Sequence, residues 1–236
     1  MPTRADLFAA YAIADRTRQL VRMNFVQSAD GAATLDGRSG PLGGETDRLL
    51  MQVLRTYADI VLVGAGTVRA EGYGGLRLED RDAVWRRDHG LTEQPRLAVA
   101  SRRLDLEPEH PVFTEAVARP IVVTCAEAPA ARRRELAEVA DVLVCGTDEV
   151  DLAEMRDRLA EGGSTQILCE GGPHLFGSLL DAGLVDEVCL TVAPRIVGGD
   201  AGRIARGAAE ADRRFALASA LSDEEGFLFL RYARPE

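Results

Sequence analysis

One acidic residue and two glycines form the clearest candidate for chemistry in this sequence. In ILCEGGPHLFGSLL, an apolar run ends at Glu170, Gly171 and Gly172 follow, and a helix is expected to begin near Pro173. The unsatisfied N–H groups and partial positive charge at a helix start could hold a pyrophosphate, and the glycines would let it approach closely. An ordinary turn between a strand and a helix, with glycine at a positive φ, accounts for the same residues equally well.

A second glycine-containing turn follows another apolar run. DIVLVGAGTVRAEG begins like the dinucleotide-binding pattern GxGxxG at Gly64, but Arg69 occupies the position of the third glycine. Thr67 could cap a short helix and offer its hydroxyl to a phosphate, or it could be a helix cap only. The motif alone favours neither interpretation.

The segment over residues 28–44, SADGAATLDGRSGPLGG, is a long glycine-rich loop, and such loops in compact domains are usually binding loops or lids. Asp30 could be a catalytic carboxylate there, although Asp-Gly is first of all a turn signal. The helix expected over Thr46–Tyr57, with Thr46 as its N-cap, presents Arg55 away from its apolar face. Arg55 is therefore either a solvated helix residue or a ligand for an anion.

Composition excludes several classes of protein. All 28 basic residues are Arg, against 38 acidic residues, and the net charge of −10 argues against sequence-independent binding of nucleic acid. The absence of Lys excludes a Walker P-loop, a Schiff-base mechanism and a Lys general base, and it leaves Arg to recognise phosphates. No CxxC, HxxxH or GxSxG motif occurs, so we expect no metal site and no hydrolase nucleophile.

The four cysteines lie in or beside apolar runs, which favours buried free thiols. No apolar run reaches the ~18–20 residues of a membrane span, and the initial MPTRADLFAA lacks the apolar region of a signal peptide. We therefore expect a cytoplasmic protein that binds neither membranes nor nucleic acid.

Short β-rich runs alternate with amphipathic helices along the chain. Several runs are nearly continuous Val, Ile and Leu, as in strands covered on both faces, so the alternation predicts an α/β fold with a mostly parallel sheet. The last two runs flank the turn-like SDEEG and predict an antiparallel hairpin, which makes the sheet mixed. We expect one domain over residues 1–236, with its core at about 20–234. The expected strands are Leu20–Gln27, Ile60–Val63, Arg96–Ala100, Ile121–Thr124, Val142–Cys145, Gln166–Cys169, Glu187–Val192, Phe215–Leu221 and Phe227–Tyr232, and the other expected helices are Ala130–Val139, Asp148–Ala160 and Pro173–Asp181.

Taken together, these segments resemble the riboflavin-biosynthesis pyrimidine reductases. The blocks are VRMNFVQSADGAA, SGPLGG, LRTYADIVLVGAGTVRAEGYGGLRL and LCEGGPHLFGSLLDAGLVDEVCLTVAPRIVGG, and their order and spacing match across residues 20–232. The resemblance implies a three-layer fold like that of dihydrofolate reductase, and NADPH-dependent hydride transfer to a C=N carbon of a pyrimidine-type substrate. In riboflavin biosynthesis that substrate is of the 5-amino-6-(5-phosphoribosylamino)uracil type. The resemblance also implies a homodimer.

The same resemblance implies roles for individual residues. Glu170 would face the substrate and orient or protonate it, with water as the alternative proton donor. Independently of the resemblance, the Ser and two Arg that follow a strand at Ser101–Arg103 could hold the 2′-phosphate of the cofactor. The other residues expected to bind the phosphorylated substrate are Asn24, Ser39, Arg55, Leu76 and Arg77. The residues expected to bind NADPH are Val26, Pro41, Gly64, Thr67, Glu71, Ser101, Gly171, Gly172, Pro173, His174, Leu175 and Phe176.

Three positions depart from the pattern of many relatives. Asn24 stands where many have Lys, Ala29 where many have Leu, and Glu71-Gly72-Tyr73 where many have Asp-Asp-Pro. Two other functions therefore stay open: dihydrofolate reduction on the same fold, and nucleotide binding without turnover. No HxE followed by PCxxC occurs, so we do not expect the zinc deaminase that is often fused to this reductase.

Overall fold

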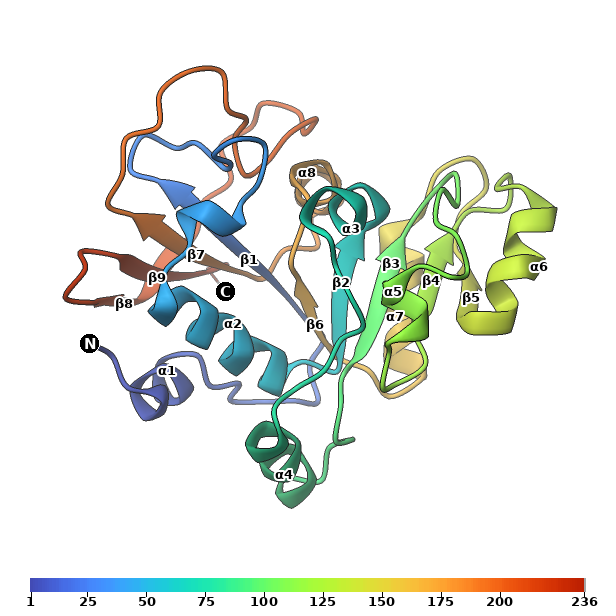
Figure 1. Ribbon diagram of the computed structural model, residues 1–236, viewed down its shortest axis with the longest axis horizontal. Helices are drawn as coiled ribbons and strands as arrows, with labels where there is room; N and C mark the ends of the chain where they lie inside the picture. Colours follow the sequence, from blue (N-terminus) through green and yellow to red (C-terminus); the bar gives the residue numbers. More distant parts are fainter. Residues whose placement is uncertain (236) are drawn as a thin grey trace.

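The apolar runs of the sequence form one nine-stranded sheet in the computed structural model, which describes residues 1–235 (Figure 1). The strand order is β5-β4-β3-β2-β6-β1-β7-β9-β8. The first seven strands in that order are parallel, whereas β9 and β8 run antiparallel to their neighbours. The predicted mixed sheet and C-terminal hairpin are confirmed. The strands are β1 (Leu20–Ser28), β2 (Ile60–Gly64), β3 (Arg96–Ala100), β4 (Ile121–Thr124), β5 (Asp141–Val144), β6 (Gln166–Cys169), β7 (Glu187–Ala193), β8 (Ala216–Ser222) and β9 (Leu228–Ala233).

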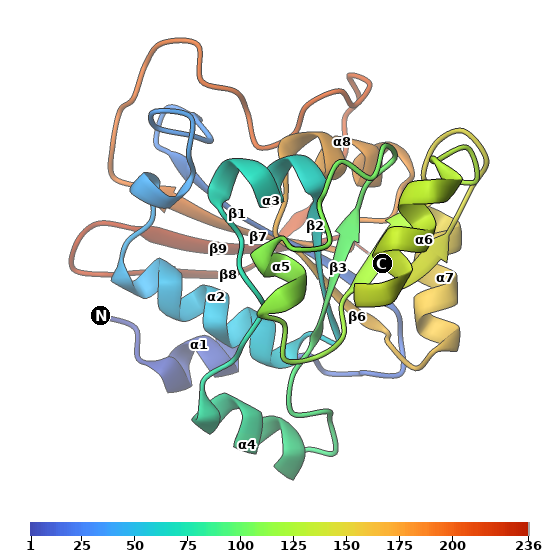
Figure 2. The same ribbon diagram turned by 45° about the vertical axis from the view of Figure 1, so that its right-hand side comes forward.

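Helices cover both faces of the parallel part of the sheet and bury its continuous apolar runs. Alternate residues of β2, such as Val61 and Val63, pack toward α1, α2 and α3, while Ile60 and Leu62 pack toward α7 and α8. The protein therefore has three layers (Figure 2). The helices are α1 (Arg4–Ala10), α2 (Glu45–Tyr57), α3 (Ala65–Glu71), α4 (Asp80–Asp88), α5 (Pro111–Thr114), α6 (Ala130–Val139), α7 (Leu152–Glu161) and α8 (Pro173–Asp181), with a 3₁₀ turn η1 (Gly40–Leu42).

Two predicted helix starts were wrong. Helix α2 begins at Glu45 with Gly44 as its N-cap, so Thr46 lies buried in the first turn instead of capping it. Helix α7 begins at Leu152, because the Asp151 carboxylate accepts hydrogen bonds from the N–H groups of Ala153 and Glu154, each at 2.9 Å. Thr67 likewise caps nothing, since Gly64 is the N-cap of α3.

The interior contains all four cysteines as free thiols. Burial raises the pKa of Cys169, at the end of β6, to about 12, and it does the same for Cys189 in β7. Across residues 1–235, no helix is long and apolar enough to cross a membrane.

Candidate active site

The carboxyl ends of the parallel strands open into a cavity of about 590 Å³. This is the edge of an open α/β sheet where ligands bind, because the chain turns into loops and helix starts there. Figure 1 shows the starts of α3 and α8 side by side beyond β2 and β6. The lining residues come from β1, from the loop before α2, from α2, and from the starts of α3 and α8: Asn24, Phe25, Val26, Ala33, Thr34, Gly37, Ser39, Gly40, Gly43, Asp47, Arg48, Met51, Gly64, Gly66, Thr67, Ala70, Glu71, Tyr73, Glu170, Gly172, Pro173, His174 and Leu175.

Glu170 lines this cavity and is held by three hydrogen bonds from two side chains. Arg55 donates to both of its carboxylate oxygens, from Nε at 2.6 Å and from Nη2 at 2.7 Å, and the Tyr73 hydroxyl donates at 2.9 Å. Only 3% of the Glu170 side chain and 13% of the Arg55 side chain are exposed. Burial lowers the pKa of Arg55, but the Glu170 carboxylate more than offsets this and the pKa is raised overall. Burial and the Glu170 charge together raise the pKa of Tyr73 well above its ordinary value.

In this geometry both carboxylate oxygens of Glu170 are paired with donors. A carboxylate that accepts a bidentate guanidinium and a hydroxyl has its charge compensated in place. The group is therefore better suited to orienting a ligand than to giving up a proton.

The start of α8 has a tight glycine turn, as its sequence indicated. Gly171 has a φ of 118°, which only glycine adopts readily, and Gly172 is the N-cap of the helix. A Cβ on Gly172 would lie 2.5 Å from the Thr67 Oγ1. The Gly171 carbonyl also accepts a hydrogen bond from Gly64 at 2.8 Å, which ties the end of β2 to this turn. The glycines thus serve a close approach of α3 to α8, and they leave backbone N–H groups at the cavity wall.

Two further polar groups, from Asn24 and Asp47, line the same cavity as Glu170. The Asn24 Oδ1 is buried and has no hydrogen-bond partner among residues 1–235. Asp47, in the first turn of α2, lines the same cavity, and burial raises the pKa of its carboxyl group. An unpaired buried acceptor and a carboxyl of raised pKa are both available to form hydrogen bonds with a ligand in this cavity.

A second cavity of about 420 Å³ adjoins the first. Both are lined by Gly64, Gly66, His174 and Leu175, so they meet at the start of α8. The second cavity continues to the end of β3, where its walls include Ser101, Arg102, Arg103, Arg69 and Glu149. The Ser101 hydroxyl accepts a hydrogen bond from the Leu104 N–H at 2.9 Å and shapes this turn.

Most residues selected from the sequence come together at these cavities. Three others lie close behind the cavity wall: Arg55 behind Glu170, Gly171 before the start of α8, and Phe176 stacked on Phe25 with ring centroids 5.2 Å apart. Pro41 is exposed in η1 and lines neither cavity. The selected residues that line a cavity are Asn24, Val26, Ser39, Gly64, Thr67, Glu71, Ser101, Glu170, Gly172, Pro173, His174 and Leu175.

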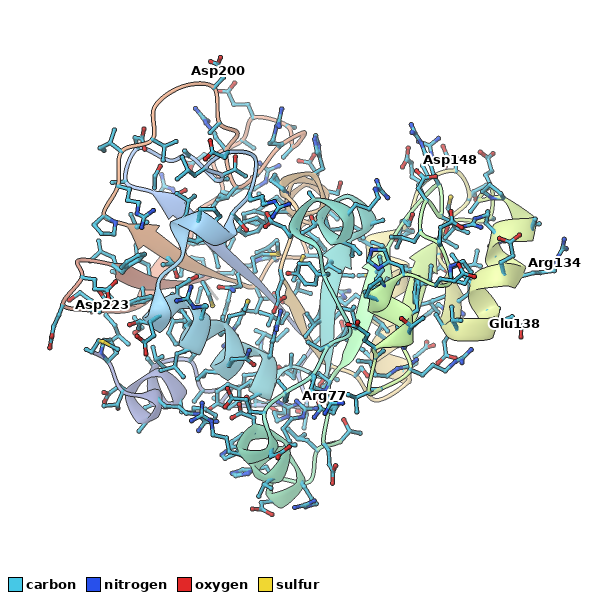
Figure 3. All side chains as sticks on the ribbon, in the orientation of Figure 1. Arg77, Arg134, Glu138, Asp148, Asp200 and Asp223 are labelled. Carbon is cyan, nitrogen blue, oxygen red and sulfur yellow. The ribbon has the colours of Figure 1, made fainter. Side chains whose placement is uncertain are left out.

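Leu76 and Arg77 do not lie at the cavity, which corrects their expected place beside the substrate. After the left-handed Gly72 ends α3, the chain descends toward α4, Leu76 is buried in the core, and Gly75 packs on the Glu115 backbone. Figure 3 places Arg77 near α4, at the opposite end of the sheet.

The sequence interpretation missed Asp47 and Tyr73. Asp47, Met51 and Arg55 follow one another at four-residue spacing on α2, so they share a face of the helix, and this spacing could have revealed Asp47. Tyr73 lies in a glycine-rich stretch with no periodicity, and only the fold brings it to Glu170.

Asp30 is a structural residue. Its carboxylate accepts the Ser28 hydroxyl at 2.5 Å and the backbone N–H groups of Gly198 and Val197 at 2.8 and 3.1 Å. These three donors, the Ser28 hydroxyl foremost, lower the pKa of Asp30 to about 2. Asp30 thereby ties the loop after β1 to the loop after β7.

Solved structures define the class of this fold. A pyrimidine reductase-like protein of Corynebacterium diphtheriae superposes with a TM-score of 0.87 at 29% identity, over 98% of each chain. Dihydrofolate reductase of Enterococcus faecalis superposes with a TM-score of 0.53 at 14% identity, over 92% of this chain and 97% of its own, which shows the fold alone. The protein therefore has the predicted dihydrofolate-reductase-like fold.

The sequence shows the family. Residues 19–229 match the RibD C-terminal domain. The 2,5-diamino-6-ribosylamino-4(3H)-pyrimidinone 5′-phosphate reductase of Methanothermobacter thermautotrophicus is 34% identical over 183 residues, which cover 77% of this chain and 81% of that protein. The chain belongs to the RibD C-terminal domain family and is a relative of the riboflavin-biosynthesis pyrimidine reductases, as the resemblance indicated.

Proposed function

We propose that this chain is an NADPH-dependent reductase, acting as one domain, that converts the ribosyl group of a ribosylaminopyrimidine phosphate to a ribityl group. The observation that carries the proposal is the pair of adjoining cavities at the start of α8. One has basic walls suited to the adenosine end of a dinucleotide, and the other combines Glu170, Asp47 and Asn24 around a mostly apolar space. The family relationship supports the same activity.

The residues present fit the cofactor. Backbone N–H groups at the start of α8, together with the Thr67 hydroxyl, would hold a pyrophosphate where the two cavities meet. NADPH, when bound, supplies the hydride. The protein must then hold the acceptor carbon close to the donor and exclude water.

The side chains that line the larger cavity indicate how the substrate would be held. Glu170, fixed by Arg55 and Tyr73, would accept hydrogen bonds from the substrate in one orientation. Asp47 has a carboxyl of raised pKa and would contact the pyrimidine edge together with Asn24. A proton can reach the reduced product from Asp47 or from water, which leaves Glu170 as an orienting residue.

A substrate panel tests this function. Purified protein is mixed with NADPH and with a ribosylaminopyrimidine 5′-phosphate, its dephosphorylated form or dihydrofolate, and cofactor oxidation is followed. We expect oxidation with the phosphorylated aminopyrimidine and much less with the other two. Turnover of dihydrofolate alone would replace the proposal with dihydrofolate reduction, and binding without any turnover would identify a non-catalytic nucleotide-binding protein.

The Asp47→Asn variant tests whether the Asp47 carboxyl takes part in turnover. It keeps the shape of the side chain but removes the titrating carboxyl, so it should lower turnover and leave NADPH binding nearly unchanged.

A further inference from the structure

The second cavity is lined by two acidic residues, Asp105 and Glu149, beside three arginines, and of the two acids Glu149 forms an ion pair with an arginine of the wall. Glu149 lies in the loop between β5 and α7, and Figure 3 shows its neighbour Asp148 at the end of the sheet where α3 and α8 begin. Backbone hydrogen bonds from Ala126 to Gly146 at 3.0 Å and from Glu127 to Thr147 at 2.9 Å hold this loop against the end of β4. The loop is therefore anchored, and it presents Glu149 to the cavity.

Glu149 neutralises one of the three arginines in the cavity wall. Its Oε1 accepts a hydrogen bond from Arg102 Nη1 in an ion pair. Arg69 is also engaged, because it donates to the Asp105 carbonyl oxygen at 2.8 Å. Of the three arginines, only Arg103 has neither an ion pair nor a side-chain hydrogen bond to another of residues 1–235, and it lines the same cavity.

We propose that Glu149 is a specificity-determining residue that lowers the preference of this site for a 2′-phosphorylated dinucleotide over its 2′-hydroxyl counterpart. The proposal rests on the proposed function, since it assigns the second cavity to the adenosine ribose. It concerns NADPH against NADH, which differ only by that phosphate.

The chemistry of the two ligands supports this role. A ribose 2′-hydroxyl donates a hydrogen bond to a carboxylate, whereas a 2′-phosphate needs arginine donors. To bind the phosphate, Arg102 must leave Glu149, and the uncompensated carboxylate then repels the phosphate. To bind the hydroxyl, the pair can stay intact, and Glu149 can accept a hydrogen bond from the hydroxyl. The Arg102–Glu149 pair thus lowers the selectivity for NADPH over NADH, whereas the unpaired Arg103 would raise it.

The affinities of the wild type and of Glu149→Gln for NADPH and NADH test the proposal by calorimetry. Because the pair is exposed, its removal should tighten NADPH binding by roughly three- to fivefold. NADH should bind equally well or more weakly. Adenosine 2′,5′-bisphosphate and AMP are used as shorter probes, because they occupy only the adenosine end of the site. Glu149→Gln should tighten binding of the bisphosphate, as for NADPH, and should not tighten binding of AMP, as for NADH. Arg102→Ala should weaken NADPH binding and leave NADH binding unchanged.

Asp148→Asn is the matched control, because it removes the same charge from the same loop at a residue that does not line the cavity. Any of three results would overturn the role of Glu149. These are no gain in NADPH affinity in Glu149→Gln, an equal gain in NADH affinity in that variant, or an equal gain in NADPH affinity in Asp148→Asn. If the wild type binds and oxidises NADPH in those cases, the proposed function stands and only this inference is wrong. If the wild type binds neither cofactor, both are wrong.

Discussion

The Arg55–Glu170 ion pair affects how a phosphate-binding role of Arg55 can be tested. The resemblance assigns Arg55 to the substrate phosphate, yet in the structure its guanidinium holds a carboxylate that is almost fully buried. Removing one partner of a buried ion pair leaves an uncompensated charge, and this costs about 3–5 kcal/mol. A loss of activity in an Arg55 variant would therefore not by itself demonstrate a phosphate contact.

We predict that Arg55→Ala lowers the free energy of unfolding by about 3–5 kcal/mol, measured by urea denaturation at pH 7. The double variant Arg55→Ala/Glu170→Gln should recover a large part of this loss, because the unpaired charge is gone. Tyr73→Phe, which removes a single hydrogen bond to Glu170, should cost only about 1 kcal/mol.

A small stability change in Arg55→Ala, with a raised KM for a phosphorylated substrate only, would contradict this prediction. That result would indicate that Arg55 binds the substrate phosphate, as the resemblance implies.

At the scale of elements, Asp30 joins the loop after β1, which carries cavity residues, to the loop after β7. This carboxylate links the segment after β1, which contains Ser39, to the turn at Val197 and Gly198. Arg195 adds a second link by donating to the Pro41 carbonyl oxygen at 2.9 Å. Figure 2 shows the segment between β7 and β8 arching over the end of the sheet where α8 begins.

We predict that Asp30→Asn lowers the melting temperature at neutral pH and has little effect near pH 2. The pKa of Asp30 is about 2 in the folded protein and higher in the unfolded chain. Its contribution is therefore fully present above about pH 4 and is lost as the pH falls toward 2. Thermal scans of the wild type and the variant from pH 7 to pH 2 measure the difference.

Asp36→Asn is the control on the same loop, because no hydrogen bond to the Asp36 side chain occurs among residues 1–235. An equal effect in both variants, or a difference that persists at pH 2, would show that the anchoring comes from elsewhere.

The elements also show what a single sequence can predict. Strands such as β2 and β6 are nearly continuous apolar runs, and these were found to within about a residue. Helices α1, α4 and α5 were missed, because they are short and α4 carries charge on most of its surface. At the site, glycine turns and helix starts were predictable from local patterns. Tyr73 and Glu149 were not, since their roles depend on which loops the sheet brings together.

At the scale of the whole molecule, strand β8 leaves one edge of the sheet open. Its sequence ALASALS carries no charge, and most of its residues are exposed, including Leu217 at 55%. Edge strands of soluble proteins usually carry charges or are covered. We propose that a second copy of the chain covers this edge.

We predict that the purified protein sediments at twice the 25.4 kDa mass of one chain, and that Leu217→Glu shifts it to the single-chain mass. Val117→Glu, at a residue that is 48% exposed and outside the sheet, should stay dimeric. A wild type of single-chain mass would disprove the dimer, and a dimeric Leu217→Glu would place the interface elsewhere.

The burial of all four thiols gives the protein an internal reporter of structural opening. Thiol reagents attack the thiolate, and Cys169 and Cys189 are buried in the central strands, where burial raises the pKa of both thiols to about 12. Their rate of alkylation at neutral pH therefore measures how often those strands separate. Because Cys169 directly precedes Glu170, a ligand that stabilises the closed site should slow its alkylation, so occupancy can be read from the unmodified chain by mass spectrometry.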